Sequence, residues 1–100
     1  MKNHFLVLLV LFFITIPSLH AQQVDLKTAR TVAKNLYYSR VSATKAFDYS
    51  EVQPVLLHTE EEKEIPLYYI FNMDQNKGFV IVSAQRNAKP ILGYSLNGRF

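Results

Sequence analysis

Few side chains in this sequence could perform catalysis, and they are not grouped in a pattern that catalysis requires. From residue 22 onward the chain has one histidine, His58, and no cysteine. Several serines are present, but none lies in a nucleophile-elbow pattern or near an evident base. An active site needs several convergent groups, and an isolated histidine beside a strand is typically a surface or packed residue. The sequence therefore predicts a protein that is not an enzyme and has no catalytic residues.

A run of acidic residues, Glu60-Glu61-Glu62-Lys63-Glu64, is the nearest approach to a metal site. Consecutive glutamates do not converge on one point, so the run indicates a solvated turn rather than a cation site. No set of side chains has zinc-ligand spacing. The three glycines, Gly78, Gly93 and Gly98, do not form a phosphate-binding loop. We therefore expect no metal and no other cofactor.

The first residues have the layout of a secretory signal peptide. A short basic start is followed by an apolar stretch over residues 5–16, and Pro17 to Ala21 ends it with a small residue. An uncleaved membrane anchor is the alternative, but about 20 apolar residues are needed to cross a bilayer. The sequence predicts a signal peptide at 1–21, a single small domain at 22–100, and export to the periplasm or outside the cell.

Charge and cysteine content restrict the partners of this domain. The net charge of the chain is +3, and its basic residues are scattered along the sequence. Scattered charge does not make a nucleic-acid-binding surface, and no membrane association is expected after signal cleavage. Because no disulfide can form, a domain of this size depends on a small apolar core to which partner binding could add stability.

The stretch Gly78–Ser83 is the centre of the predicted fold. It is apolar almost throughout, and such a strand needs cover on both faces. Residues 66–73 form a second strong strand, and a loop over residues 74–78, with Gly78 able to take a positive φ, makes the two antiparallel neighbours. A helix over residues 25–40, with Asp25 as N-cap, has one apolar stripe. The remaining predicted elements are a short helical turn at 44–49, strands at 55–58 and 90–95, and a turn over residues 96–100.

The two strongest strands are apolar on both sides, whereas one helix can cover only one of them. Tyr69 and Phe71 alternate with Tyr68 and Ile70 along the first of these strands. The second face is therefore either covered by residues 41–53 or left open as a partner site. A membrane-surface helix is disfavoured, because the polar face of the helix carries little charge.

An ordered series of motifs resembles a known family. The helix LKTARTVAKNLYYSRV, then LYYIFN, GFVIVSA and PILGYSLNGRF, is similar to the prodomain of streptopain-like cysteine proteases and to the stand-alone inhibitors related to that prodomain. The similarity extends over residues 24–100. Its most specific part is a strand motif made of Gly78, Phe79, Val80, Ile81, Val82, Ser83, Pro90, Ile91, Leu92, Gly93 and Tyr94.

The resemblance implies an α+β fold, in which a small antiparallel sheet of about four strands packs against the N-terminal amphipathic helix. It also implies an exported inhibitor, monomeric when free, that binds a streptopain-like (papain-fold) cysteine protease non-covalently over its active-site region. The candidate contacts are Asn97, Gly98, Arg99 and Phe100, since arginine and aromatic side chains often dominate interfaces.

The sequence departs from the family pattern at the turn after GFVIVSA. Relatives have an acidic turn of the type Asp-Asp-Arg, whereas this chain has Gln85-Arg86-Asn87. In relatives, the segment that reaches the catalytic groups of the protease is expected to follow the Gly-x-Phe ending. Residues 97–100 would then block the protease themselves, or bind without entering its active site, or belong to a remnant of a longer zymogen. A detached prodomain that assists folding, and a structural or adhesive surface domain, are the alternative functions.

Overall fold

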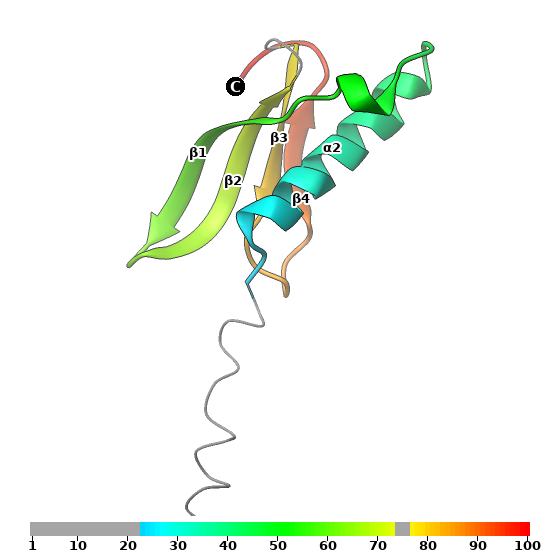
Figure 1. Ribbon diagram of the computed structural model, residues 1–100. Helices are drawn as coiled ribbons and strands as arrows, with labels where there is room; N and C mark the ends of the chain where they lie inside the picture. The colour runs from blue at the N-terminus through cyan, green and yellow to red at the C-terminus, as the bar shows by residue number, and fades with distance from the viewer. Residues whose placement is uncertain (1–22, 74–76) are drawn as a thin grey trace, which may run out of the picture.

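The computed structural model describes residues 23–73 and 77–100, which form one helix packed on one face of a four-stranded antiparallel sheet (Figure 1). The predicted α+β fold is thereby confirmed. The predicted signal peptide and residues 74–76 of the predicted hairpin loop lie outside the described residues. Within the described ranges, no helix is both long enough and apolar enough to cross a membrane.

Helix α2 spans Leu26–Ser42 and begins as its sequence predicts. The Asp25 carboxylate accepts a hydrogen bond from the Thr28 backbone N–H at 2.7 Å, which satisfies one of the donors left free in the first turn. Ala29, Ala33 and Tyr37 recur every fourth residue and are buried against the sheet. The two alanines let the helix approach the strands closely, and Tyr37 fills the space near its other end.

The strands are β1 (Val55–Glu62), β2 (Ile65–Met73), β3 (Gly78–Ser83) and β4 (Ile91–Ser95), and they lie in sequence order. The predicted antiparallel pairing of β2 with β3 is confirmed, and Phe71 lies opposite Val80. As predicted, β3 is central, since β2 and β4 both pair with it. β4 begins one residue later than predicted, at Ile91. Pro90 has no N–H to donate, although its carbonyl accepts a hydrogen bond from the Ser83 N–H at 2.9 Å.

The acidic run is not the solvated turn that the sequence predicts. Glu60, Glu61 and Glu62 continue β1 and pair with β2, and only Lys63 and Glu64, with φ of 51° and 67°, form the turn. β1 lies at the edge of the sheet, where charged side chains remain hydrated while the backbone pairs. The strand is therefore longer than the predicted range of 55–58.

The connection after α2 also differs from its prediction. The helical turn expected at 44–49 is absent, and a single 3₁₀ turn, η2 (Tyr49–Glu51), follows instead. Phe47 stacks on Tyr38, with ring centroids 6.2 Å apart, and Val52 is fully buried in the core. These apolar contacts hold the connection against the helix in an extended form and replace local helical hydrogen bonds.

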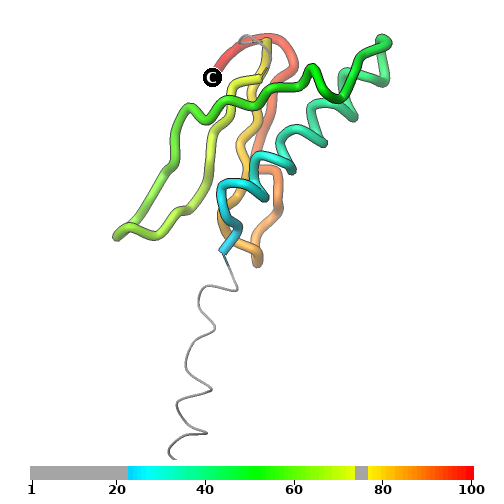
Figure 2. Tube along the Cα trace, viewed as in Figure 1, coloured from blue at the N-terminus to red at the C-terminus, as the bar shows by residue number. Residues whose placement is uncertain are grey.

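The segment before α2 is joined to the sheet. Gln23 forms a β-bridge with Gln85, and the Val24 N–H donates to the Ala84 carbonyl at 2.8 Å. The Tyr69 hydroxyl donates to the Val24 carbonyl at 2.8 Å, and burial raises the pKa of this phenol. These bonds place the start of the helix beside the β3–β4 connection, as the chain trace shows (Figure 2).

Gly78 is required for a reason other than the predicted one. Among the described glycines only Gly98 has a positive φ. A Cβ at Gly78 would instead collide with the backbone oxygen of Ser95 and lie 3.0 Å from Cε1 of Tyr37. Gly78 therefore permits the close approach of β3, the end of β4 and α2.

Replacing Gly78 by alanine should destabilise the fold, because backbone atoms must move to admit the methyl group. We expect Gly78→Ala to lower the free energy of unfolding by ~1–3 kcal/mol, measured by urea denaturation. Gly93→Ala is the matched control, since its Cβ would lie 3.7 Å from Cδ1 of Ile81, an ordinary contact. Equal stability of the two variants would contradict this reading of Gly78.

Asp25 should make the thermal stability depend on pH. The hydrogen bond from the Thr28 backbone N–H, with a second one from its side chain, holds the pKa of the Asp25 carboxyl below its ordinary value of 3.8. Stabilisation by the carboxylate is therefore fully present above pH 3.8 and is lost as the pH falls through the folded-state pKa. We expect the melting temperature of the wild type to exceed that of Asp25→Asn at neutral pH and to approach it in acid. Asp25→Ala, which removes the cap, should melt below both, and a difference that does not change with pH would contradict the assignment.

Candidate functional site

The two faces of the sheet differ in their cover. On the helix side, Tyr69, Phe71 and Met73 of β2 pack with Val80 and Val82 of β3 against α2. The alternate residues point to the other side, here called the outer face. Residues 41–53 do not cover this outer face, because Phe47 and Val52 pack on the helix side. The second face is expected either to be covered by residues 41–53 or to remain open as a partner site, and the structure excludes the first alternative.

The register defines which side chains share the outer face. Asn72 lies opposite Val55 on β1 and opposite Phe79 on β3. In the next row, Ile70 lies between His58 and Ile81. Directly paired residues project from the same side of a sheet. The outer face therefore carries the apolar Val55, Ile70, Phe79 and Ile81 together with the polar His58 and Asn72.

Residues 96–100 turn from the end of β4 onto this outer face. The Asn97 N–H donates to the Ser95 hydroxyl at 3.2 Å, and the Gly98 N–H donates to the Lys77 carbonyl at 3.3 Å. Gly98 has a φ of 146°, a conformation that side chains rarely permit. These bonds carry the chain across the β2–β3 end of the sheet, beside the C label in Figure 1.

Phe100 is attached to the outer face by two contacts. Its N–H donates to Oδ1 of Asn72 at 3.1 Å, and its ring meets the Phe79 ring edge to face, with centroids 5.3 Å apart. Phe100 nevertheless remains 60% exposed, and Val55 beside Asn72 is 61% exposed. We call the group of Val55, Phe79 and Phe100 the outer apolar patch. Large exposed apolar groups that are held in place are typical of interaction surfaces.

Of the candidate contact residues, the structure brings Phe100 to the outer apolar patch and places Asn97 and Gly98 at the turn that leads there. Arg99, between Gly98 and Phe100 in the chain, is exposed. Sequence reasoning missed Asn72 and Val55. Asn72 could have been noticed as a polar residue inside the aromatic strand LYYIFN. Val55 has no such signal, because its role depends on the strand register.

The strand motif has a mainly structural role. Val80 and Val82 belong to the core, whereas Phe79 and Ile81 lie on the outer face. The Ser83 hydroxyl accepts a hydrogen bond from the Gln85 N–H at 3.0 Å, at the start of the β3–β4 connection. The rest of the motif runs from the exposed Pro90 through Ile91, Leu92 and Gly93 to Tyr94, whose ring lies 5.7 Å from the Arg40 guanidinium.

The turn that departs from the family pattern is joined to the fold by polar contacts. The Gln85 side-chain amide donates to the Pro66 carbonyl at 2.9 Å. Arg86 Nε donates to the Gln23 carbonyl at 3.2 Å. The turn therefore links β2 to the segment before α2 without an acidic residue.

Within the described part of the chain, no group of three or more histidine, aspartate or glutamate side chains could hold a metal ion. His58 Nε2 lies 3.2 Å from a carboxylate oxygen of Glu60, and both side chains are about half exposed. This solvated pair has the geometry of a surface interaction on the edge strand.

The fold is thus a small α+β domain in which residues 96–100 lie against the sheet face opposite the helix. Residues 21–100 match the family described as Spi protease inhibitor. The chain therefore belongs to the Spi protease inhibitor family, which confirms the resemblance to inhibitors of this kind.

A second comparison is with a protease. The thiol protease/hemagglutinin PrtT of Porphyromonas gingivalis is 28% identical over 90 residues, which cover 90% of this chain. The match covers only 10% of that protein, so the chain spans about a tenth of its length. No solved structure shows significant similarity to this chain.

Removing the side chain of Asn72 should release residue 100 from the outer face. We expect Asn72→Ala to increase the amide hydrogen-exchange rate of Phe100 about fivefold, the effect of losing one ordinary hydrogen bond. Asn72→Asp, which retains an acceptor oxygen, should keep exchange slow, and Asn87→Ala in the exposed β3–β4 turn should leave it unchanged. Equal exchange rates in all these proteins, measured by NMR, would show that the bond does not hold the segment.

Proposed function

We propose that this chain is an exported inhibitor that binds a streptopain-like cysteine protease non-covalently, over the region of its active site. The observation that carries the proposal is its membership of a protease-inhibitor family, together with its similarity to a segment of a thiol protease. In this proposal residues 1–21 are the signal peptide, residues 22–100 are the inhibitor domain, and the protease supplies all catalytic groups.

The proposed contact surface consists of residues 97–100 and the outer apolar patch. Phe100 is exposed yet held by Asn72 and Phe79, so little conformational freedom is lost when a partner covers it. Arg99 precedes it and offers a planar cation for a carboxylate or carbonyl of the protease. Such an arrangement would block access to a cleft by bulk and shape, without any covalent step.

A second candidate function is assistance in protease folding. The similarity to part of a much larger thiol protease favours it, because a segment within a protease can act on the folding of the rest. Refolding a denatured streptopain-like protease with and without the domain separates the two functions. A higher yield of protease that is fully active in the presence of the domain would favour folding assistance over inhibition.

Titration against a purified streptopain-like protease at fixed concentration is the direct test of inhibition. We expect activity to fall linearly to an equivalence point near one inhibitor per protease when the affinity is high. Absence of inhibition at micromolar excess of the folded protein would overturn the proposal. A structural or adhesive role would then be the favoured function.

Phe100→Ala should weaken inhibition about tenfold or more, because truncation of a central aromatic contact typically costs at least one power of ten in affinity. Tyr94→Ala is the matched control, since Tyr94 is also an exposed aromatic residue but lies opposite Val80, on the helix side of the sheet. A similar loss in both variants would argue against the outer face as the contact surface.

A further inference from the structure

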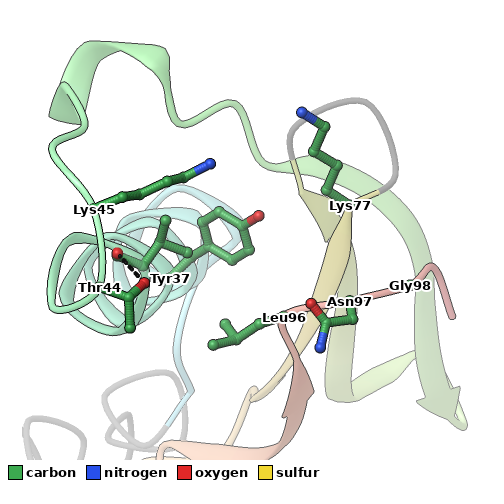
Figure 3. A pocket seen from close by; sticks show the side chains of 8 residues that line it. Tyr37, Thr44, Lys45, Lys77, Leu96, Asn97 and Gly98 are labelled. Carbon is green, nitrogen blue, oxygen red and sulfur yellow. Dashed lines mark hydrogen bonds between the residues drawn. The ribbon is translucent and has the colours of Figure 1, made fainter.

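A cleft opens on the other side of residues 96–98, between this segment and the end of α2 (Figure 3). Its volume is about 610 Å³, and it continues into a second hollow of about 420 Å³. Tyr37, Val41, Lys45 and Lys77 line both parts, and Asn97 and Gly98 line the larger one. The cleft is thus bordered by the segment that also carries Phe100.

Two lysine side chains reach this cleft from opposite sides. Lys45 comes from the connection after α2 and Lys77 from the start of β3, as Figure 3 shows. The buried ring of Tyr37 lies between them, with its hydroxyl directed toward the same space (Figure 3). Two cations above an apolar wall create a local positive potential that is stronger than on a flat surface.

Neither lysine has an acidic partner within the described residues. Among the described residues, 23–73 and 77–100, the ion pair that forms is that of His58 with Glu60, on the edge of the sheet. Lys45 Nζ lies 5.9 Å from the centre of the Phe47 ring, a cation–π contact that leaves its hydrogen-bond donors available. Glu51 is the acidic residue of the lining, and it belongs to the second hollow rather than to the part beside Asn97.

The positions of both lysines are set by the fold. The Lys77 N–H donates to the Met73 carbonyl at 2.9 Å, and the Lys77 carbonyl accepts the bond from Gly98. The N–H of Lys45 donates to the Val41 carbonyl at 3.3 Å. A ligand would therefore meet two ammonium groups whose backbone is already held in place.

We propose that this cleft binds an acidic side chain of the protease that the chain inhibits, with Lys45 and Lys77 as the binding cations. The inference rests on the proposed function and adds the chemistry of a second contact. A glutamate or aspartate carboxylate would form charge-assisted hydrogen bonds with both ammonium groups. The occupant is assigned to the protease because the cleft shares Asn97 and Gly98 with the proposed contact surface, and it is assigned as acidic because two lysines line the cleft.

Charge reversal of the two lysines tests the proposal in the intact protein. In Lys45→Glu/Lys77→Glu, inhibition of the protease at low salt should weaken about tenfold or more. The matched control, Lys27→Glu/Lys89→Glu, makes the same change in net charge at two exposed lysines away from the cleft, and should alter inhibition less than about threefold. The difference between the two variants should shrink at high salt. Equal effects of both variants, with folding verified by circular dichroism, would overturn the proposal while inhibition by the wild type still stands.

A second measurement keeps the test independent of inhibition. NMR spectra are recorded while an acetylated tetraglutamate peptide, or a tetraglutamine peptide of equal length, is added at constant ionic strength. Shifts at Lys45, Lys77 and Gly98 with the glutamate peptide alone, absent from the reversed variant, would support the site even if the wild type failed to inhibit. Shifts with inorganic phosphate but none with the glutamate peptide would overturn it, because the cleft would then select phosphate rather than carboxylate.

Discussion

The packing of one helix against one face of a four-stranded sheet is the constraint on which the rest of this structure depends. Ala29, Ala33 and Tyr37 bring α2 close to β2 and β3, and together they bury most of the apolar core. In the absence of cysteine, no disulfide can compensate for a smaller core. The close packing also explains why Gly78 has no side chain, since the end of β4 and the helix both approach it. The same arrangement leaves the opposite face of the sheet without a second layer in the described residues.

The segment that follows β4 lies against the outer face of the sheet. The Gly98 N–H bonds to the Lys77 carbonyl, and the Phe100 N–H bonds to Asn72, so the segment is held at the β2–β3 end of the sheet. On one side of it lies the outer apolar patch, and on the other lies the cleft with its two lysines. An apolar contact and a charged contact on either side of one segment suit a protein that acts by binding. Membership of the Spi protease inhibitor family agrees with that arrangement.

Much of the fold could be predicted because several local signals agree. The Asp25 cap and the spacing of Ala29 to Tyr37 predict α2, and the continuous apolar stretches predict β2 and β3. Predictions failed where tertiary contacts overrode local character. The three glutamates joined β1 because an edge strand needs only its backbone to pair. Phe47 and Val52 drew the connection after α2 onto the core, which replaced the expected helical turn. The sequence indicates residues 97–100 as candidate contacts but gives no sign of the bond from Phe100 to Asn72, since a hydrogen bond between residues so far apart leaves no local pattern.

The sequence by itself determined the class of this protein and the identity of its main elements. Periodicity, capping and turn residues are local properties, and the absence of grouped catalytic side chains in the domain can be read directly from its composition. Only the tertiary structure decided which face of the sheet is covered and what lies beside the terminal segment. Strand register placed Val55 and Phe79 on either side of Asn72, and packing of the helix end brought Lys45 near Lys77. These juxtapositions join residues from distant parts of the chain, and they depend on register and packing, which the spacing of residue types does not encode.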